Sequence, residues 1–285
     1  MTWLELCWGT LDRASLIELL EAAASAGYDT VAVSPHSYLR LSPGEVRAVQ
    51  SFRAAHQLRV HVVDAIMAGM PGSPSADRVE PRFRHFFEYS ASQVFDVASQ
   101  LDADVVNIAH FLGAAVDPDL LIDAVAGLAV EARSRGLLLT IEFLPGTGIP
   151  DVAAAHHIAA AAGPDVVSVM VDTWHHARSG GTVGDLRELP PGAIGGLQVS
   201  DREAVPAEAG YRIMEDRLLP GRGELPLRAV VSAALANNPQ IAIGVEVFSR
   251  ELRAMAFDDA AGAAFRALRQ VVAVPPRASP GTGDR

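Results

Sequence analysis

The feature that most constrains the fold of this chain is a regular alternation of short apolar runs with amphipathic, helix-like segments. Most of the runs are rich in Val and Ile and too short for helices, which is typical of buried parallel strands. Strands that alternate with helices indicate βαβ units and a parallel sheet. Eight apolar runs are present, at Thr2–Trp8, Thr30–Ser34, Leu58–Asp64, Asp104–His110, Leu137–Phe143, Val166–Asp172, Ala193–Ser200 and Ile241–Phe248.

Eight such units predict a single α/β domain, a closed (β/α)8 barrel or TIM barrel, over residues 1–273. An open, doubly wound sheet is the alternative, because periodicity does not distinguish the two. Residues 274–285 are rich in Pro, Gly and Ser and have no apolar face. We expect them to form a disordered C-terminal tail. Among the helices expected between strands are residues 118–135, 151–162, 227–237 and 258–272.

The charge and residue composition exclude several classes of protein. The net charge of -11 argues against nucleic acid as a partner, which would require a basic surface. A single cysteine rules out an internal disulfide framework, and the absence of lysine rules out Schiff-base chemistry. No long uncharged apolar run predicts a membrane span, and the first residues lack a basic segment typical of a signal peptide. The cytoplasm is therefore the expected compartment.

Two connections are longer than the rest, residues 65–81 and residues 201–225. Long loops in a compact domain are often functional lids or insertions. Each follows an apolar run, so in a barrel each would lie at the catalytic mouth.

Polar side chains lie at the ends of four consecutive apolar runs: Glu142, Asp172, Gln198 and Glu246. Carboxylates within such runs are costly unless they are paired or coordinated. In a barrel, the carboxyl ends of the strands meet at one mouth, so these four side chains would converge. Three carboxylates and an amide oxygen suit a hard divalent ion such as Mn or Mg, and tolerate Co or Zn. The alternative is that each is only a polar cap at the end of a strand.

The C-terminal half resembles the xylose isomerase-like superfamily of (β/α)8 sugar isomerases and epimerases. The resemblance depends on these five segments, which follow the order of the family: Ile141-Glu142-Phe143, Val171-Asp172-Thr173-Trp174-His175, Leu197-Gln198-Val199-Ser200-Asp201, Leu219-Pro220-Gly221-Arg222-Gly223-Glu224-Leu225 and Gly244-Val245-Glu246-Val247-Phe248. Sugar epimerases of the family usually have His at the third metal position, where this chain has Gln198. Some dehydratases of the superfamily resemble it in that respect.

The resemblance implies one divalent metal ion bound by Glu142, Asp172, Gln198 and Glu246. It also implies that Glu142 and Glu246 serve as acid and base. His175, three residues after Asp172, is the third candidate, because histidine near neutrality is the usual proton carrier. Members of the superfamily often pair, so a homodimer is a further expectation by resemblance.

Four further residues are candidates for binding a small-molecule substrate: His110, Arg202, Arg222 and Trp174. An arginine at a strand end can bind a carboxylate or hydroxyl through its planar fork, but it can equally form a surface salt bridge. A strand-end histidine is as often structural, and Trp174 could either line an apolar pocket or belong to the core.

These observations favour a metal-dependent isomerase or epimerase of a small polyhydroxy carbonyl compound, acting through proton abstraction and a metal-stabilised enediolate. The alternative is a lyase that dehydrates a cyclic keto acid or an inosose, like 3-dehydroshikimate dehydratase. A repair nuclease would need a multi-metal cluster and a basic face, and a barrel without turnover would have lost a ligand or base. We expect neither, because the charge is acidic and all four ligand positions are filled.

Overall fold

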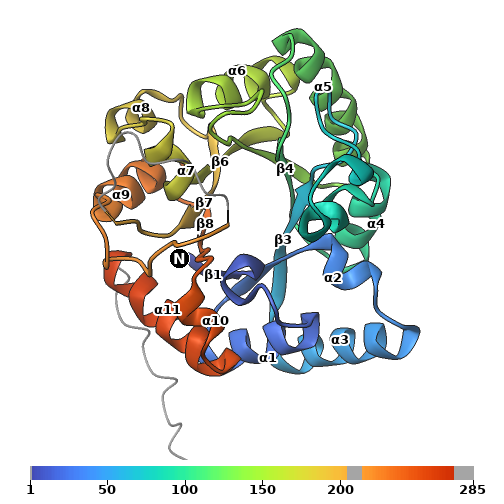
Figure 1. Cartoon of the computed structure of the whole chain (residues 1–285), viewed down its shortest axis with the longest axis vertical. Helices are drawn as coiled ribbons and strands as arrows, with labels where there is room; N and C mark the ends of the chain where they lie inside the picture. Colours follow the sequence, from blue (N-terminus) through green and yellow to red (C-terminus); the bar gives the residue numbers. More distant parts are fainter. Residues whose placement is uncertain (1, 204–213, 273–285) are drawn as a thin grey trace, which may run out of the picture.

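The computed structural model describes residues 2–203 and 214–272, in which eight parallel strands close into a barrel (Figure 1). Each strand pairs with the next along the chain, and β1 pairs with β8 to close the ring. The closed barrel is therefore confirmed, and the open doubly wound sheet is excluded. The strands are β1 Trp3–Cys7, β2 Thr30–Val33, β3 Arg59–Ile66, β4 Val105–Ala109, β5 Leu138–Glu142, β6 Val167–Asp172, β7 Ile194–Val199 and β8 Ala242–Val245.

Helices surround this barrel, as Figure 1 shows. The four helices expected from sequence are present with each end within one residue of its predicted position. The α-helices are α1 Leu16–Ala26, α2 Pro35–Leu39, α3 Pro43–His56, α4 Ala91–Gln100, α5 Pro118–Ser134, α6 Val152–Ala162, α7 Thr173–Arg178, α8 Val183–Glu188, α9 Leu227–Asn237, α10 Arg250–Arg253 and α11 Phe257–Val271. The described residues also form the short 3-10 helices η1 Trp8–Leu11, η2 Ala76–Arg78 and η3 Pro81–Phe87.

Local signals in the sequence set where several helices begin. Helices α1, α3, α4 and α8 each start with a capping box, in which a Ser or Thr side chain and the residue three positions later exchange hydrogen bonds with each other's backbone. Helix α1 ends at Gly27, whose left-handed conformation (φ 86°) suits glycine. Two of the four helices expected from sequence, α5 and α6, begin after Asp117 and Asp151, whose side chains accept a hydrogen bond from a backbone N–H of the first turn.

The main core lies between the barrel and its helices, where outward-facing strand residues such as Leu6, Val31 and Ile141 pack against them. A smaller apolar cluster of Cys7, Ala32, Val62 and Val105 fills part of the barrel interior. Barrel interiors of this kind are packed layers of side chains rather than pores. A ligand can therefore bind at an end of the barrel but not within it.

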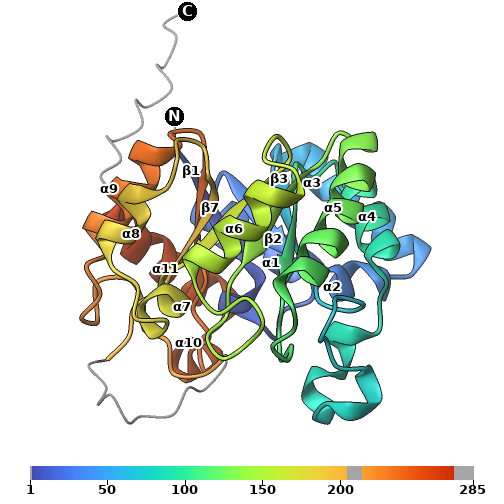
Figure 2. The same ribbon diagram turned by 90° about the horizontal axis from the view of Figure 1, so that it is seen from above.

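That end is the mouth formed by the carboxyl ends of the strands. The short helices α2, α7 and α10 lie at this end of the barrel, on the lower side in Figure 2. Strand β3 runs to Ile66, so the first long connection begins slightly later than expected and contains η2. The second connection returns to the end of β7 through an antiparallel bridge between Leu218 and Asp201.

Part of the predictions falls outside the described residues, namely the tail 274–285 and positions 204–213 of the second loop. Among the described helices, none combines the length and apolar character needed to cross a lipid bilayer.

One buried acid in the barrel interior makes the stability of the fold depend on pH. Burial raises the pKa of Glu5 from 4.5 to about 7, although His61 and a hydrogen bond from the Thr30 hydroxyl (3.3 Å) oppose the shift. The folded chain therefore keeps this proton at pH values where the unfolded chain has lost it. The stabilisation is complete below about pH 4.5 and is lost as pH rises through about 7.

We expect Glu5→Gln to remove this dependence, because the amide does not ionise. The free energy of unfolding of the variant should rise relative to that of the wild type by about 3 kcal/mol between pH 4.5 and 7. Urea denaturation of both proteins across this range measures the difference. Parallel stability curves for the two proteins would show that Glu5 does not titrate in this way.

Candidate functional site

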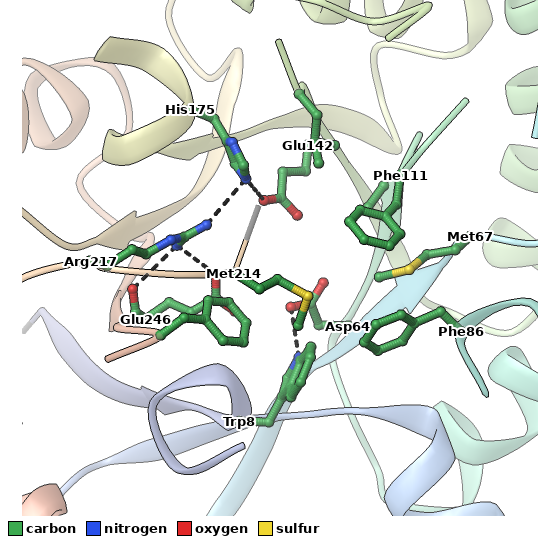
Figure 3. A pocket seen from close by; sticks show the side chains of 13 residues that line it. Trp8, Asp64, Met67, Phe86, Phe111, Glu142, His175, Met214, Arg217 and Glu246 are labelled. Carbon is green, nitrogen blue, oxygen red and sulfur yellow. Dashed lines mark hydrogen bonds and ion pairs between the residues drawn. The ribbon is translucent and has the colours of Figure 1, made fainter. Parts of the chain in front are cut away.

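A small cavity of about 40 Å³ opens at the barrel mouth (Figure 3). Its lining combines five polar or ionisable residues with eight apolar ones. The first group is Asp64, Glu142, His175, Arg217 and Glu246; the second is Trp8, Met67, Phe86, Ala109, Phe111, Leu144, Met214 and Phe248. All three residues predicted to be catalytic, Glu142, His175 and Glu246, therefore meet in one cavity.

Glu142 ends β5 and is held from two sides. The amide of Asn107 donates to its Oε2 at 3.0 Å, and Nε2 of His175 lies 3.3 Å from its Oε1. The Thr140 hydroxyl in turn donates to Asn107 Oδ1 at 2.7 Å, which turns the Asn107 amide nitrogen towards the acid. The inward-facing side chains of neighbouring strands thus fix the position of this carboxylate.

Asp172 ends β6 and caps α7. Its Oδ1 accepts a hydrogen bond from the His175 backbone N–H at 2.9 Å, so the helix start places the histidine beside the carboxylate. Its Oδ2 lies 2.7 Å from Nη1 of Arg217. Among the described residues, oxygen or nitrogen atoms of Glu142, Asp172 and His175 lie within 4.8 Å of one another, close enough to share one ion.

Arg217 lies among these acids, with only 2% of its side chain exposed. Its Nη1 also lies 3.0 Å from Glu246 Oε2, and its Nη2 is 3.3 Å from Nε2 of His175. Its backbone N–H donates to the carbonyl of Phe248, which anchors the segment across the mouth. A buried arginine in this position offsets the charge of carboxylates that would otherwise repel one another.

Arg217 was not predicted from the sequence, which instead pointed to Arg202 and Arg222 in the same connection. The loop folds back at the Leu218–Asp201 bridge, and the Asp201 carboxylate accepts backbone hydrogen bonds from Gly221 and Gly223. A usable signal was present, because Arg217 is followed directly by two leucines, an apolar setting that suits a buried residue.

Four predicted substrate-binding residues do not line the cavity. His110 donates from Nε2 to the Pro71 carbonyl (2.8 Å) and accepts from the Gly148 N–H (3.1 Å), so it braces two loops. Arg202 pairs with Glu224 at 3.0 Å, and Arg222 is exposed and pairs with Glu251 at 3.2 Å. Trp174 is buried behind Arg217, whose guanidinium lies 5.8 Å from its ring centroid.

Burial controls the ionisation of the site. It raises the pKa of Glu142 and of Glu246 well above the usual range, although Arg217 opposes the effect. Burial acts on Asp172 in the same direction, but Arg217 and His175 outweigh it and lower the pKa of that carboxyl. Burial lowers the pKa of His175 to about 4, so its imidazole is neutral at pH 7.

The residues at the mouth also fit a divalent metal ion. Gln198 is buried, and its Oε1 has no hydrogen-bond partner in the described part of the chain. Its Nε2 donates to Asp64 Oδ2 at 3.4 Å, which leaves the amide oxygen as the atom available to an ion. Together with the oxygens of Glu142, Asp172 and Glu246, this gives the hard donor set that Mn and Mg prefer.

Asp64 is the second residue that the sequence analysis left out of the site. Three side-chain donors converge on its buried carboxylate: Trp8 Nε1 (3.1 Å), Asn107 Nδ2 (2.8 Å) and Gln198 Nε2. The sequence feature that identified the predicted metal ligands also applies to Asp64, because Asp64 is the last residue of an apolar run.

The chain belongs to the xylose isomerase-like TIM barrel family, whose model matches residues 20–271. Over 251 residues, 84% of this chain, it is 24% identical to a 3-dehydroshikimate dehydratase of Pseudomonas putida. Over 141 residues, 49% of this chain, it is 26% identical to an inosose isomerase of Halalkalibacterium halodurans.

These matches cover 37% of the dehydratase and 49% of the isomerase, so the chain matches half or less of each curated relative. Among solved structures, the IolI protein with a bound zinc atom is similar with a TM-score of 0.80 and 19% identity, and the match covers 95% of this chain and 98% of that one. At 19% identity, this similarity shows a shared fold and does not extend to function.

We expect Asp64→Asn to weaken metal binding about 10- to 100-fold. An amide at position 64 can donate to Gln198, so the Gln198 amide would turn and withdraw its oxygen from the site. Titration of the metal-free protein with Mn by calorimetry gives the affinity.

The matched control is Gln198→Leu, alone and combined with Asp64→Asn. If Asp64 acts through Gln198, its replacement changes affinity little once Gln198 is gone. An equal loss in both backgrounds would contradict the positioning role and indicate a direct effect of the Asp64 charge.

Proposed function

We propose that this protein is a divalent-metal-dependent enzyme that moves a proton next to a carbonyl group, and that it isomerises or epimerises a small hydroxy-carbonyl compound. The observation that carries the proposal is that two buried glutamates, Glu142 and Glu246, and the neutral His175 face one cavity beside a hard donor set. Proton abstraction of this kind needs a positioned acid and base together with stabilisation of the negative oxygen that develops.

Glu142, Asp172, Gln198 and Glu246 would hold the metal ion. When bound, a divalent ion acts as a Lewis acid on the oxygens of the substrate and stabilises their negative charge. The Oε1 atom of Gln198 supports this assignment, because it is buried and has no hydrogen-bond partner among the described residues.

The chain's own side chains then divide the remaining work. One of the two glutamates, Glu142 or Glu246, takes the proton from carbon, and the other glutamate returns it. The two side chains can share this work because Glu142 reaches the cavity from the end of β5 and Glu246 from the residue that follows β8. His175, 3.3 Å from Glu142, can relay that proton. The guanidinium of Arg217 lines the cavity and can donate a hydrogen bond to a substrate oxygen. That hydrogen bond becomes stronger as negative charge develops on the oxygen.

A dehydratase is the second candidate, and the longer curated match supports it. The relative that is similar over 84% of this chain is named as a 3-dehydroshikimate dehydratase. The same acid, base and metal serve both reactions: reprotonation of the intermediate gives an isomer, and loss of a β-hydroxyl gives a dehydration product.

The first test is metal content together with hydrogen exchange. We expect the wild type to hold one divalent equivalent per chain by elemental analysis and Glu142→Ala to lose it. The wild-type protein should exchange carbon-bound hydrogen in deuterated water with a member of a panel of ketoses, inososes and dehydroshikimate. Failure to bind any divalent metal after reconstitution with Mn or Mg would remove the proposal.

We expect Glu246→Gln to lower the exchange rate by about 10²- to 10⁴-fold while the fold persists, because the amide cannot carry the proton. The matched control is Glu251→Gln, an exposed glutamate five residues further along that pairs with Arg222. Circular dichroism and metal content are measured for both variants. Near wild-type exchange in Glu246→Gln would show that the acid–base assignment is wrong.

A further inference from the structure

The cavity has two chemically different halves, which Figure 3 shows on opposite sides. On one side lie His175, Arg217 and Glu246, all of them ionisable. On the other side lie Met67, Phe86 and Phe111, and the carboxylates of Asp64 and Glu142 lie between the two groups. We call the apolar lining residues Trp8, Met67, Phe86 and Phe111 the aromatic wall.

The aromatic wall is built from rings that hold one another in place. The Phe111 ring packs against those of Phe83 and Phe86, with centroids 5.2 and 5.6 Å apart and nearly perpendicular planes. Trp8 packs against Phe86 and Phe248 at 5.8 and 5.5 Å. Edge-to-face packing of this kind makes a stiff apolar surface whose orientation does not depend on the ligand.

This wall offers a ligand no side-chain hydrogen-bond donor from the described residues. The polar atom that it contains, Trp8 Nε1, already donates to Asp64 at 3.1 Å. A hydroxyl group pushed against such a wall would lose its hydrogen bonds to water without gaining others, which costs binding free energy. An alkyl or aryl group in the same place would gain free energy by leaving water.

The wall is also accessible from the cavity. Phe86 and Trp8 are only partly buried, whereas Phe83 and Phe87 behind them are buried in the same apolar cluster. The cavity of about 40 Å³ is small, so it suits a compact group better than a long one. Met214 lies between the two halves in Figure 3, and its unbranched side chain is the most adaptable of the lining groups.

We propose that the substrate carries its reactive hydroxy-carbonyl group at one end and a compact apolar substituent, a short alkyl chain or a single aromatic ring, at the other. This inference rests on the proposed function, since the polar half is assumed to hold the reacting atoms. The inferred substrate has fewer hydroxyl groups than the polyhydroxy compound expected from the sequence. A fully hydroxylated chain would place several hydroxyls against the aromatic wall without hydrogen-bond partners.

The test uses three hydroxamic acids as probes, since a hydroxamate presents two adjacent oxygens as an enediolate does. Acetohydroxamate has a methyl substituent, benzohydroxamate a phenyl ring, and gluconohydroxamate a polyhydroxylated chain. Their affinities are measured by calorimetry on the Mn-loaded protein, and each is divided by the affinity of the same probe for free Mn.

We expect benzohydroxamate to bind at least about tenfold more tightly than acetohydroxamate, and gluconohydroxamate to bind no more tightly than acetohydroxamate. Phe86→Ala should remove most of the phenyl advantage while leaving acetohydroxamate binding unchanged. Phe83→Ala is the matched control, because Phe83 packs behind Phe86 and Phe111 but does not line the cavity. The control should retain the advantage.

The outcomes separate this inference from the proposed function. If metal-dependent binding occurs but gluconohydroxamate binds most tightly, or if the phenyl ring confers no advantage, the inference is overturned and the proposed function stands. The inference is also overturned if Phe83→Ala and Phe86→Ala lose the phenyl advantage equally. If no hydroxamate binds in a metal-dependent way, the proposed function fails and the inference fails with it.

Discussion

The site depends on one buried charge interaction, the contact of the Arg217 guanidinium with Asp172 and Glu246 at 2.7 and 3.0 Å. Several buried carboxylates at one barrel mouth would repel one another and pay a large desolvation cost without a positive partner. Arg217 is that partner among the described residues, and Trp174 and Phe248 flank its guanidinium at 5.8 and 5.0 Å. Their rings favour a cation in this position.

Around that interaction, each remaining acid is positioned by neutral donors rather than by further charge. Asn107 donates to both Asp64 and Glu142, so one amide links two strand ends. Gln198 donates to Asp64, and its own amide oxygen accepts no hydrogen bond from the part of the chain that the structure describes. This network holds the ionisable side chains of the cavity in place, and the packed rings of Trp8, Phe86 and Phe111 form an apolar surface beside them.

The strand ends Glu142, Asp172, Gln198 and Glu246 could be predicted because parallel strands of a barrel all end at the same mouth, so their sequence positions already imply proximity. The substrate-binding predictions lacked such a constraint. His110 also ends an apolar run, but its ring turns to Pro71 and Gly148 between two loops. Arg202 and Arg222 are near the mouth in sequence, yet acidic neighbours engage them away from the cavity.

The sequence alone determined the alternation of eight strands with helices and the bounds of four of those helices, because apolar periodicity is a local property. Closure of the sheet into a barrel was decided by the structure, since the same periodicity also suits an open doubly wound sheet. Only the tertiary structure decided that Arg217 reaches the acids and that Phe86 and Phe111 form one wall opposite them. Those side chains come from connections between strands and helices, and the position of a connection depends on contacts between residues far apart in the chain, such as the bridge between Asp201 and Leu218.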